Sequence, residues 1–198
     1  MPPLKALMLD VDGVLIKPGP GGWAADLEGD LGLSRAALAE HFFAVHWDDV
    51  VMGRAGLHER LAPVLAKIAP HLTSQRLAAY WFEKDAVLDQ RLLDDLAELR
   101  ARGLALHLAT VQEHLRADYI WSSLGFRERF DAMHYAAELG CGKPDPAFFA
   151  KVAERTGFAP AEMLLIDDKA ENVEAARAAG WGGLLWTGEH PLADLLDL

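Results

Sequence analysis

The chain has 198 residues, of which 52% are apolar and 25% are charged, and its formal net charge is −11. This composition indicates a globular protein with a sizeable core, and its acidic balance argues against nucleic acid or an anionic membrane as the main partner. Cys141 is the only cysteine, which excludes a disulfide within the chain, and no leader or long apolar run is visible, so a cytoplasmic protein with a small-molecule partner is expected.

Five short apolar runs have the length and composition of buried strands, and amphipathic stretches with helical spacing separate the later ones. This alternation predicts an α/β fold, with a Rossmann-like, doubly wound parallel sheet as its core. The predicted strands are residues 6–9, 104–109, 132–135, 163–166 and 183–186, and the predicted core helices are residues 92–102, 115–124, 147–156 and 170–179.

The stretch between the first two predicted strands is far too long for a single crossover helix. It has helical periodicity at residues 36–45, 57–69 and 74–82, and it begins at a helix-breaking run of proline and glycine. We therefore predict an inserted α-helical cap subdomain at residues 17–88. The catalytic core then comprises residues 1–16 and 89–198.

The first predicted strand ends in paired carboxylates, Asp10 and Asp12, and Gly13 follows. Two acids so close together repel each other unless a cation lies between them or one of them keeps its proton. Because Asp-Gly is also a common turn sequence, this motif alone fits a polar turn as well as a catalytic strand end.

Other polar residues stand where later strands end, and ligands bind at the carboxyl ends of strands in open parallel sheets. The second strand leads to Thr110, whose hydroxyl can hold a phosphate oxygen or cap the next helix, because Glu113 follows at the spacing of a capping box. Lys143 lies on a proline-containing loop before a helix. The fourth strand leads to Asp167 and Asp168.

Together these residues predict a phosphate site beside a metal site. Several carboxylates at one edge of a sheet need a hard cation, and a site made of oxygen ligands suits magnesium. Magnesium and Lys143 would neutralise a phosphoryl group that Thr110 also contacts, so that a carboxylate can attack it. Asp10, at the strand end, is the better nucleophile, and Asp12, on the turn, is better placed to move a proton.

The order and spacing of these motifs resemble those of the haloacid dehalogenase-like hydrolase superfamily, and the resemblance extends over nearly the whole chain. The motifs are residues 10–14, Thr110, Lys143 within residues 142–146, and residues 167–168 followed by Asn172. The resemblance implies a phosphatase-type member with a helical cap inserted after the first motif.

The resemblance also implies roles for the acidic residues. Asp10 would attack phosphorus to form an aspartyl-phosphate, and Asp12 would protonate the leaving group and then activate water. Magnesium would be held by Asp10, by the backbone carbonyl of Asp12 and by Asp167, with Asp168 binding it directly or through a water. Asn172 fits either a support for these carboxylates or a helix cap.

The cap is expected to select the substrate, and its best candidates for substrate contact are Trp47 and Arg54. Tryptophans in a small helical bundle are more often part of its core. The resemblance favours a magnesium-dependent hydrolase acting on a small phosphorylated metabolite, with a sugar phosphate as the first choice. A phosphomutase on the same fold and a catalytically idle binding or scaffold protein remain alternatives, and the oligomeric state is open.

Overall fold

In the computed structural model, which describes residues 3–196, five parallel strands form one sheet in the order β3-β2-β1-β4-β5. The central strand β1 pairs with β2 on one side and with β4 on the other. The predicted α/β class and doubly wound parallel sheet are confirmed, with strand ends shifted by one residue. The strands are β1 (Ala6–Leu9), β2 (Ala105–Thr110), β3 (Ala132–Tyr135), β4 (Met163–Asp167) and β5 (Gly182–Leu185).

Both faces of the sheet are covered, which explains why the strand sequences are continuous apolar runs. Alternate side chains of β1 enter different layers: Leu7 and Leu9 pack with α6 and α11, whereas Ala6 and Met8 pack with α9 and α10. The helical segments of the core are α6 (Gln90–Ala101), α7 (His114–Asp118), η2 (Tyr119–Ser123), η3 (Phe126–Glu128), α8 (Ala136–Leu139), α9 (Pro146–Thr156), η4 (Pro160–Glu162), α10 (Ala170–Ala178) and α11 (Leu192–Leu195).

One predicted core helix differs from the structure. Residues 115–124 were expected to form a regular α-helix, but α7 ends at Asp118 and continues as the π-helix η2. The neighbouring residues Tyr119 and Ile120 serve different layers, because Tyr119 packs against the cap and Ile120 lies fully buried in the core. The wider π turn directs the side chain of Tyr119 to the cap and that of Ile120 to the core.

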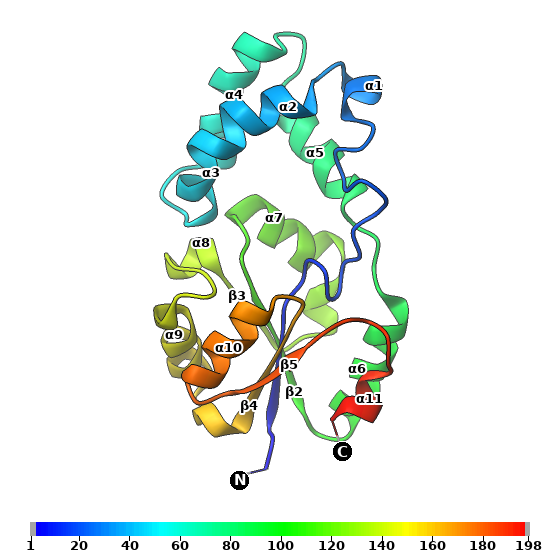
Figure 1. Cartoon of the computed structure of the whole chain (residues 1–198), viewed down its shortest axis with the longest axis vertical. Coiled ribbons are helices and arrows are strands. Elements are labelled where there is room, and N and C mark those ends of the chain that lie inside the picture. Colours follow the sequence, from blue (N-terminus) through cyan, green and yellow to red (C-terminus); the bar gives the residue numbers. More distant parts are fainter. Residues whose placement is uncertain (1–2, 197–198) are drawn as a thin grey trace.

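A helical cap lies between β1 and β2 in the sequence and stands beyond the carboxyl ends of the strands (Figure 1). The predicted helix at residues 36–45 is longer than expected, since it runs from α2 through the π-helix η1 into α3. The cap segments are α1 (Leu27–Leu31), α2 (Arg35–Leu38), η1 (Ala39–Phe43), α3 (Ala44–Val51), α4 (Leu57–Ile68) and α5 (Ser74–Lys84).

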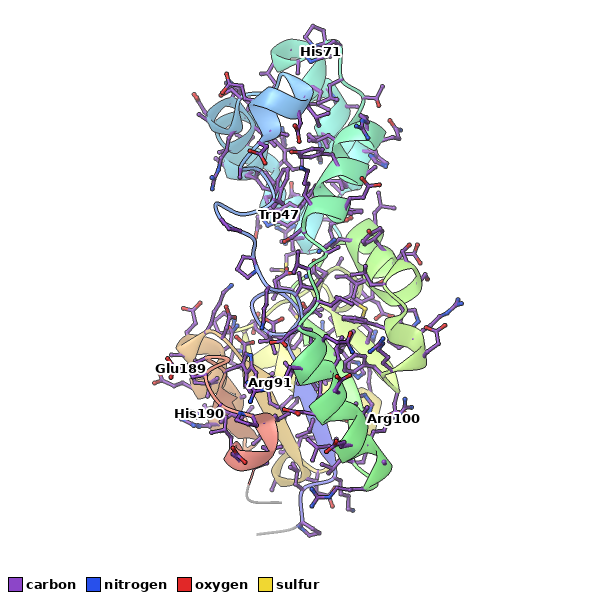
Figure 2. The ribbon with its side chains drawn as sticks, turned by 90° about the vertical axis from the view of Figure 1, so that its right-hand side faces the viewer. Trp47, His71, Arg91, Arg100, Glu189 and His190 are labelled. Atoms are coloured by element: carbon purple, nitrogen blue, oxygen red, sulfur yellow. The ribbon has the colours of Figure 1, made fainter. Side chains whose placement is uncertain are left out.

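An aromatic cluster holds the cap together. Trp81 stacks on Trp23 with ring centroids 5.0 Å apart, and Trp47 lies 5.5 Å from Trp81 and 5.4 Å from Phe43. Figure 2 shows His71 at the far end of the cap and Trp47 at the end nearer to the core. Buried aromatic surface therefore supplies much of the packing within the cap.

The two linkers between core and cap run side by side. Ile16 and Leu88 form an antiparallel bridge, the Lys17 amide donates to the carbonyl of Val87 at 2.8 Å, and the Asp89 amide donates to the carbonyl of Leu15 at 2.9 Å. The proposed division into core residues 1–16 and 89–198 and cap residues 17–88 falls at this crossing. It stays a prediction that these hydrogen bonds support.

A buried arginine joins the core helix α7 to the end of the cap helix α5. The side chain of Arg116 is only 1% exposed and donates to the carbonyl of Phe82 at 3.1 Å and to that of Asp85. Its guanidinium also lies over the rings of Phe82 and Tyr119. A buried charge is tolerated only when it is paired and hydrogen-bonded, so these contacts hold the second linker against the core.

A second contact between cap and core involves the loop that joins α3 to α4. Gly53 has a φ of +72°, and a Cβ added there would lie 2.2 Å from the carbonyl oxygen of Ala137 in α8. Only glycine allows the backbones to approach so closely. In the described part of the chain, no helix combines the length and hydropathy needed to cross a membrane.

Two histidines on the neighbouring strands β2 and β3 contact each other. His107 Nδ1 and His134 Nε2 lie 3.1 Å apart, the rings are stacked, and His134 Nδ1 has no partner among the described atoms. Burial lowers the pKa of His134 from 6.5 to about 4, and the neighbouring His107 contributes to this decrease. His134 is therefore neutral in the folded protein at neutral pH.

We predict that His134 makes the fold sensitive to acid. The unfolded chain takes up a proton at His134 as the pH falls through 6.5, whereas the folded chain does so only near 4. The contribution of His134 to the free energy of unfolding is therefore fully present above pH 6.5 and is lost as the pH falls towards 4. Between pH 7 and pH 5 this loss amounts to about 2 kcal/mol. Urea unfolding at both pH values should show a smaller loss in His134→Leu, whereas the exposed control His41→Leu should match the wild type. An equal loss in all three proteins would contradict the prediction.

Candidate active site

Three carboxylates meet where β1 and β4 end. Asp10 directly follows β1, Asp167 is the last residue of β4, and Asp168 comes next. One oxygen from each can lie within 4.8 Å of the others. The Asp10 amide donates to the carbonyl of Ile166 at 2.9 Å, so Asp10 is still held by the sheet. Neighbouring parallel strands thus bring together residues that are far apart in the sequence.

Lys143 lies among these carboxylates. Its side chain is fully buried, its Nζ lies 3.1 Å from Asp10 Oδ1, and it forms a second ion pair with Asp167. The loop that carries it ends where Asp145 caps α9 by accepting a hydrogen bond from the Ala147 amide at 2.8 Å. Lys143 is therefore a buried counter-charge and not a solvated loop lysine.

Asp167 is surrounded by hydrogen-bond donors. The Asn172 amide group donates to both carboxylate oxygens, at 3.0 and 3.1 Å, and the Lys169 backbone N–H donates to Oδ1 at 2.9 Å. Together with Lys143, these donors engage both oxygens of Asp167. Asn172 therefore binds this carboxylate, while Lys169 occupies the N-cap position of α10.

The electrostatics of the cluster fit a cation. Burial raises the pKa of Asp10, the Lys143 ammonium opposes this, and the carboxylate of Asp167 adds to the increase. The pKa of Asp168 is also raised, first by burial and then by Asp10 and Asp167. Lys143 does not fully compensate the negative charge. A set of oxygen ligands with uncompensated charge suits magnesium, so the residues present fit this ion.

Gly13 makes room for Asp168. Its φ is +83°, and a Cβ added there would lie 2.2 Å from Asp168 Oδ2. The turn after Asp12 thus passes directly against the third carboxylate, and glycine is required both for the backbone conformation and for the space. The Asp-Gly pair of the sequence is more than a turn signal.

Asp12 faces the same site from the turn after β1. Its Oδ2 accepts a hydrogen bond from Gln112 Nε2 at 2.7 Å, and the same nitrogen lies 3.4 Å from Thr110 Oγ1. Burial raises the pKa of Asp12, and the hydrogen bond from Gln112 and the charge of Arg116 oppose it. Part of the Asp12 side chain still reaches solvent, although the surrounding protein desolvates its carboxyl group.

Thr110 does not cap the helix that follows it, which corrects one of the two sequence-based interpretations. The helix α7 begins four residues later, and Glu113 is its N-cap, with its carboxylate accepting from the amides of Leu115 at 2.9 Å and Arg116 at 2.5 Å. Residues 111–113, which belong to neither strand nor helix, separate β2 from α7. The buried Thr110 hydroxyl is therefore free of the capping role.

The polar residues line one small hollow of about 130 Å³. Larger hollows occur elsewhere, including one of about 380 Å³ beside α6, but none of them is lined by this set of acids and lysine. The site is thus identified by the acidic residues and the lysine that line one hollow, and not by the volume of the hollow. The lining residues are Asp10, Asp12, Thr110, Val111, Lys143, Lys169, Glu171 and Asn172.

The structure does not bring the two cap candidates to the lining of this hollow. Arg54 is half-exposed and forms ion pairs with Asp48 and, at 2.8 Å, with Asp49. Trp47 packs in the aromatic cluster of the cap. Arg54 follows Gly53, which contacts the core, so Arg54 lies at the border between cap and core. Substrate contact by either residue stays a prediction.

Comparisons with known proteins agree with this geometry. The haloacid dehalogenase-like hydrolase family matches residues 4–180. The phosphoglycolate phosphatase of Thiobacillus denitrificans is 29% identical over 189 residues, which cover 90% of this chain and 81% of that protein.

Solved structures show the same fold. A haloacid dehalogenase family enzyme of Bacteroides thetaiotaomicron, solved as a magnesium complex, superposes with a TM-score of 0.83 at 19% identity and covers 98% of this chain and 99% of its own. A predicted hydrolase of the same type from Porphyromonas gingivalis gives 0.81 at 19% identity, with 98% and 96% covered.

We predict that Gly13→Ala disturbs the carboxylate cluster. The substitution places a Cβ in the position of the Asp168 carboxylate, in addition to the cost of about 1–2 kcal/mol for an alanine at positive φ. Gly157→Ala, at a φ of +71° with open space around it, is the matched control for the backbone cost alone. Gly13→Ala should lose at least about 1 kcal/mol more than the control in urea unfolding, because overpacking adds to the strain. It should also bind magnesium more weakly in calorimetry, and equal behaviour of the two variants would refute the close approach.

Removal of the Lys143 charge should destabilise the fold. Lys143→Met leaves Asp167 buried without its counter-ion, so unfolding in the presence of a chelator should show a loss of about 3 kcal/mol. Addition of Asp167→Asn should restore part of this loss, because it removes one of the two buried carboxylates, Asp10 and Asp167, that lose their counter-charge. The control Lys84→Met breaks an ion pair with Asp30 in which both side chains are exposed, at 45% and 44%, and it should cost less than about 1 kcal/mol. Additive losses in the double variant would show that the two charges do not interact.

Proposed function

Because this chain belongs to the haloacid dehalogenase-like hydrolase family, we propose that it is a magnesium-dependent phosphomonoester hydrolase that acts through an aspartyl-phosphate at Asp10. One observation carries the proposal. The Asp10 carboxylate lies beside the buried ammonium of Lys143 in a hollow that Asp12 and Thr110 also line. Nucleophile, counter-charge, proton donor and hydroxyl are thus assembled in one small space.

The residues divide the reaction between them. The Asp10 carboxylate attacks the phosphorus of the substrate, and the bond from phosphorus to the leaving oxygen breaks. Asp12 gives its proton to that oxygen, and then takes a proton from the water that attacks the aspartyl-phosphate and releases inorganic phosphate. Lys143 and the Thr110 hydroxyl hold the phosphoryl oxygens, and Lys143 reduces their repulsion of Asp10.

Magnesium supplies further charge neutralisation of the phosphoryl group when it is bound. We propose that Asp10 and Asp168 hold it directly. Both carboxylate oxygens of Asp167 are already bound by Lys143, Asn172 and the Lys169 amide. The main role of Asp167 is therefore to orient Lys143. This arrangement differs from the expectation that Asp167 is the direct ligand, and measurement of magnesium affinity in Asp168→Asn and Asp167→Asn would distinguish the two.

The substrate we favour is a small phosphomonoester of a hydroxy acid, with 2-phosphoglycolate as the first candidate. The size of the hollow supports a small substrate, and several relatives that match most of the chain are phosphoglycolate phosphatases. Lys169 lines the hollow in addition to Lys143 and offers a second positive charge for a substrate carboxylate. The sugar phosphate expected from the sequence stays a prediction.

We predict magnesium-dependent phosphate release from 2-phosphoglycolate. Release should exceed that from sugar phosphates, should stop in excess chelator, and should fall at least about a thousandfold in Asp10→Asn, which keeps the shape of the side chain but removes the nucleophile. The test is an assay of released phosphate over a panel that includes 2-phosphoglycolate, sugar phosphates and p-nitrophenyl phosphate.

Each other outcome leads to a different function. Activity that persists in chelator or in Asp10→Asn would refute the proposed mechanism. Transfer of phosphate to a sugar without its release would indicate a mutase. No turnover of any compound, together with binding of phosphate esters, would indicate a binding protein.

A further inference from the structure

Gln112 is a buried polar residue that the motifs of the sequence do not include. The residue is only 4% exposed, and its backbone carbonyl accepts a hydrogen bond from the Ala137 amide at 3.1 Å, which ties this segment to α8. Its amide nitrogen lies 2.7 Å from Asp12 Oδ2 and 3.4 Å from Thr110 Oγ1. Gln112 therefore connects two residues of the site that belong to different strand ends.

The direction of these hydrogen bonds follows from the groups involved. An ionised carboxylate can only accept, so the Gln112 amide must present its N–H groups to Asp12. Within the described chain, Asp12 Oδ1 receives no hydrogen bond, whereas Oδ2 is engaged by Gln112. When Asp12 holds a proton, that proton is therefore on Oδ1, since a proton on Oδ2 would face the donating amide.

Thr110 is affected by the same contact. Its Oγ1 accepts from the second N–H of Gln112, which leaves the hydroxyl proton of Thr110 free to point to another acceptor. In the hollow that both residues line, that acceptor is a phosphoryl oxygen of the substrate. A single amide thus sets the donor direction of two neighbouring groups.

We infer that Gln112 is a positioning residue that fixes the proton of Asp12 on Oδ1, towards the leaving oxygen of the substrate, and keeps the Thr110 hydroxyl as a donor to the phosphoryl group. This inference rests on the proposed phosphatase function. It assigns to Gln112 an effect that depends on the leaving group. An alkoxide leaving group needs the proton of Asp12, whereas p-nitrophenolate leaves without it.

The test compares an alkyl phosphate, 2-phosphoglycolate, with p-nitrophenyl phosphate in wild type and Gln112→Leu. The quantity to measure is kcat/KM, because it reports the steps up to transfer of the phosphoryl group to Asp10. General acid catalysis contributes about 10²-fold or more, so kcat/KM for the alkyl phosphate should fall by about that factor. For p-nitrophenyl phosphate the loss should be at least about tenfold smaller, since only the contribution of Thr110 is affected.

Two further variants make the test decisive. Gln90→Leu is the matched control, because Gln90 donates to Asp94 Oδ1 at the same 2.7 Å on an exposed face of α6. It should leave both substrates unchanged. Gln112→His restores a donor and should recover part of the alkyl-phosphate activity. If Gln112→Leu does not fold, as judged by thermal unfolding, Gln112→Glu takes its place, since it has a similar shape and no donor when ionised.

The outcomes separate the two proposals. A selective loss with the alkyl phosphate supports the role of Gln112. Equal losses with both substrates, or no loss, would overturn it and show that Gln112 only fills space. If the wild-type protein releases no phosphate from either substrate with magnesium, the proposed function fails first, independently of Gln112.

Discussion

Mutual repulsion between Asp10, Asp167 and Asp168 is the constraint on which the rest of the site depends. Carboxylates at such short distances cannot all stay ionised in a desolvated pocket without positive charge. Lys143 provides part of that charge at 3.1 Å from Asp10 Oδ1, and the geometry of the three oxygens leaves room for a divalent cation to provide the rest. The same negative charges that make the cluster costly for folding make it suitable for binding a divalent cation, so stability and cation binding place opposite demands on these residues.

The rigid sheet keeps the three carboxylates close together in spite of their repulsion. The cluster comes from β1 and β4, which are neighbouring strands covered on both faces, so the carboxylates cannot move apart without disturbing the core. Asn172 on α10 adds a hydrogen bond to Asp167, and Gln112 beyond β2 adds one to the nearby Asp12. Preorganisation of this kind means that little reorganisation is needed when charge develops on the substrate, which is where electrostatic catalysis gains most of its effect.

The core could be predicted from the sequence because its signals are local. Apolar runs that end in polar residues identified the strands and the residues Asp10, Thr110 and Asp167 at their carboxyl ends. Lys143, on a loop between two helices, was found from its place in the ordered motifs of the family. Other features depend on contacts between distant segments. Glu113 and not Thr110 caps α7, because three residues outside strand and helix follow β2. The π turn at Tyr119 reflects packing against two layers at once. Gln112 reaches Asp12 and Arg116 reaches Phe82 across many residues of sequence, so no pattern within a short window reveals these contacts. Helical periodicity does not place Trp47 or Arg54 relative to the core.

The paired linkers at Ile16 and Leu88 have a consequence for the evolution of the fold. The two ends of the cap are hydrogen-bonded to each other where they leave the core. The cap is therefore a closed loop that is attached to the sheet at one place. The entropic cost of such a closed loop grows only slowly with its length. The catalytic sheet can therefore carry a smaller, larger or unrelated cap without a change in its strand order. A change in the cap then leaves the strand ends, and with them the spacing of Asp10, Asp167 and Asp168, where they are.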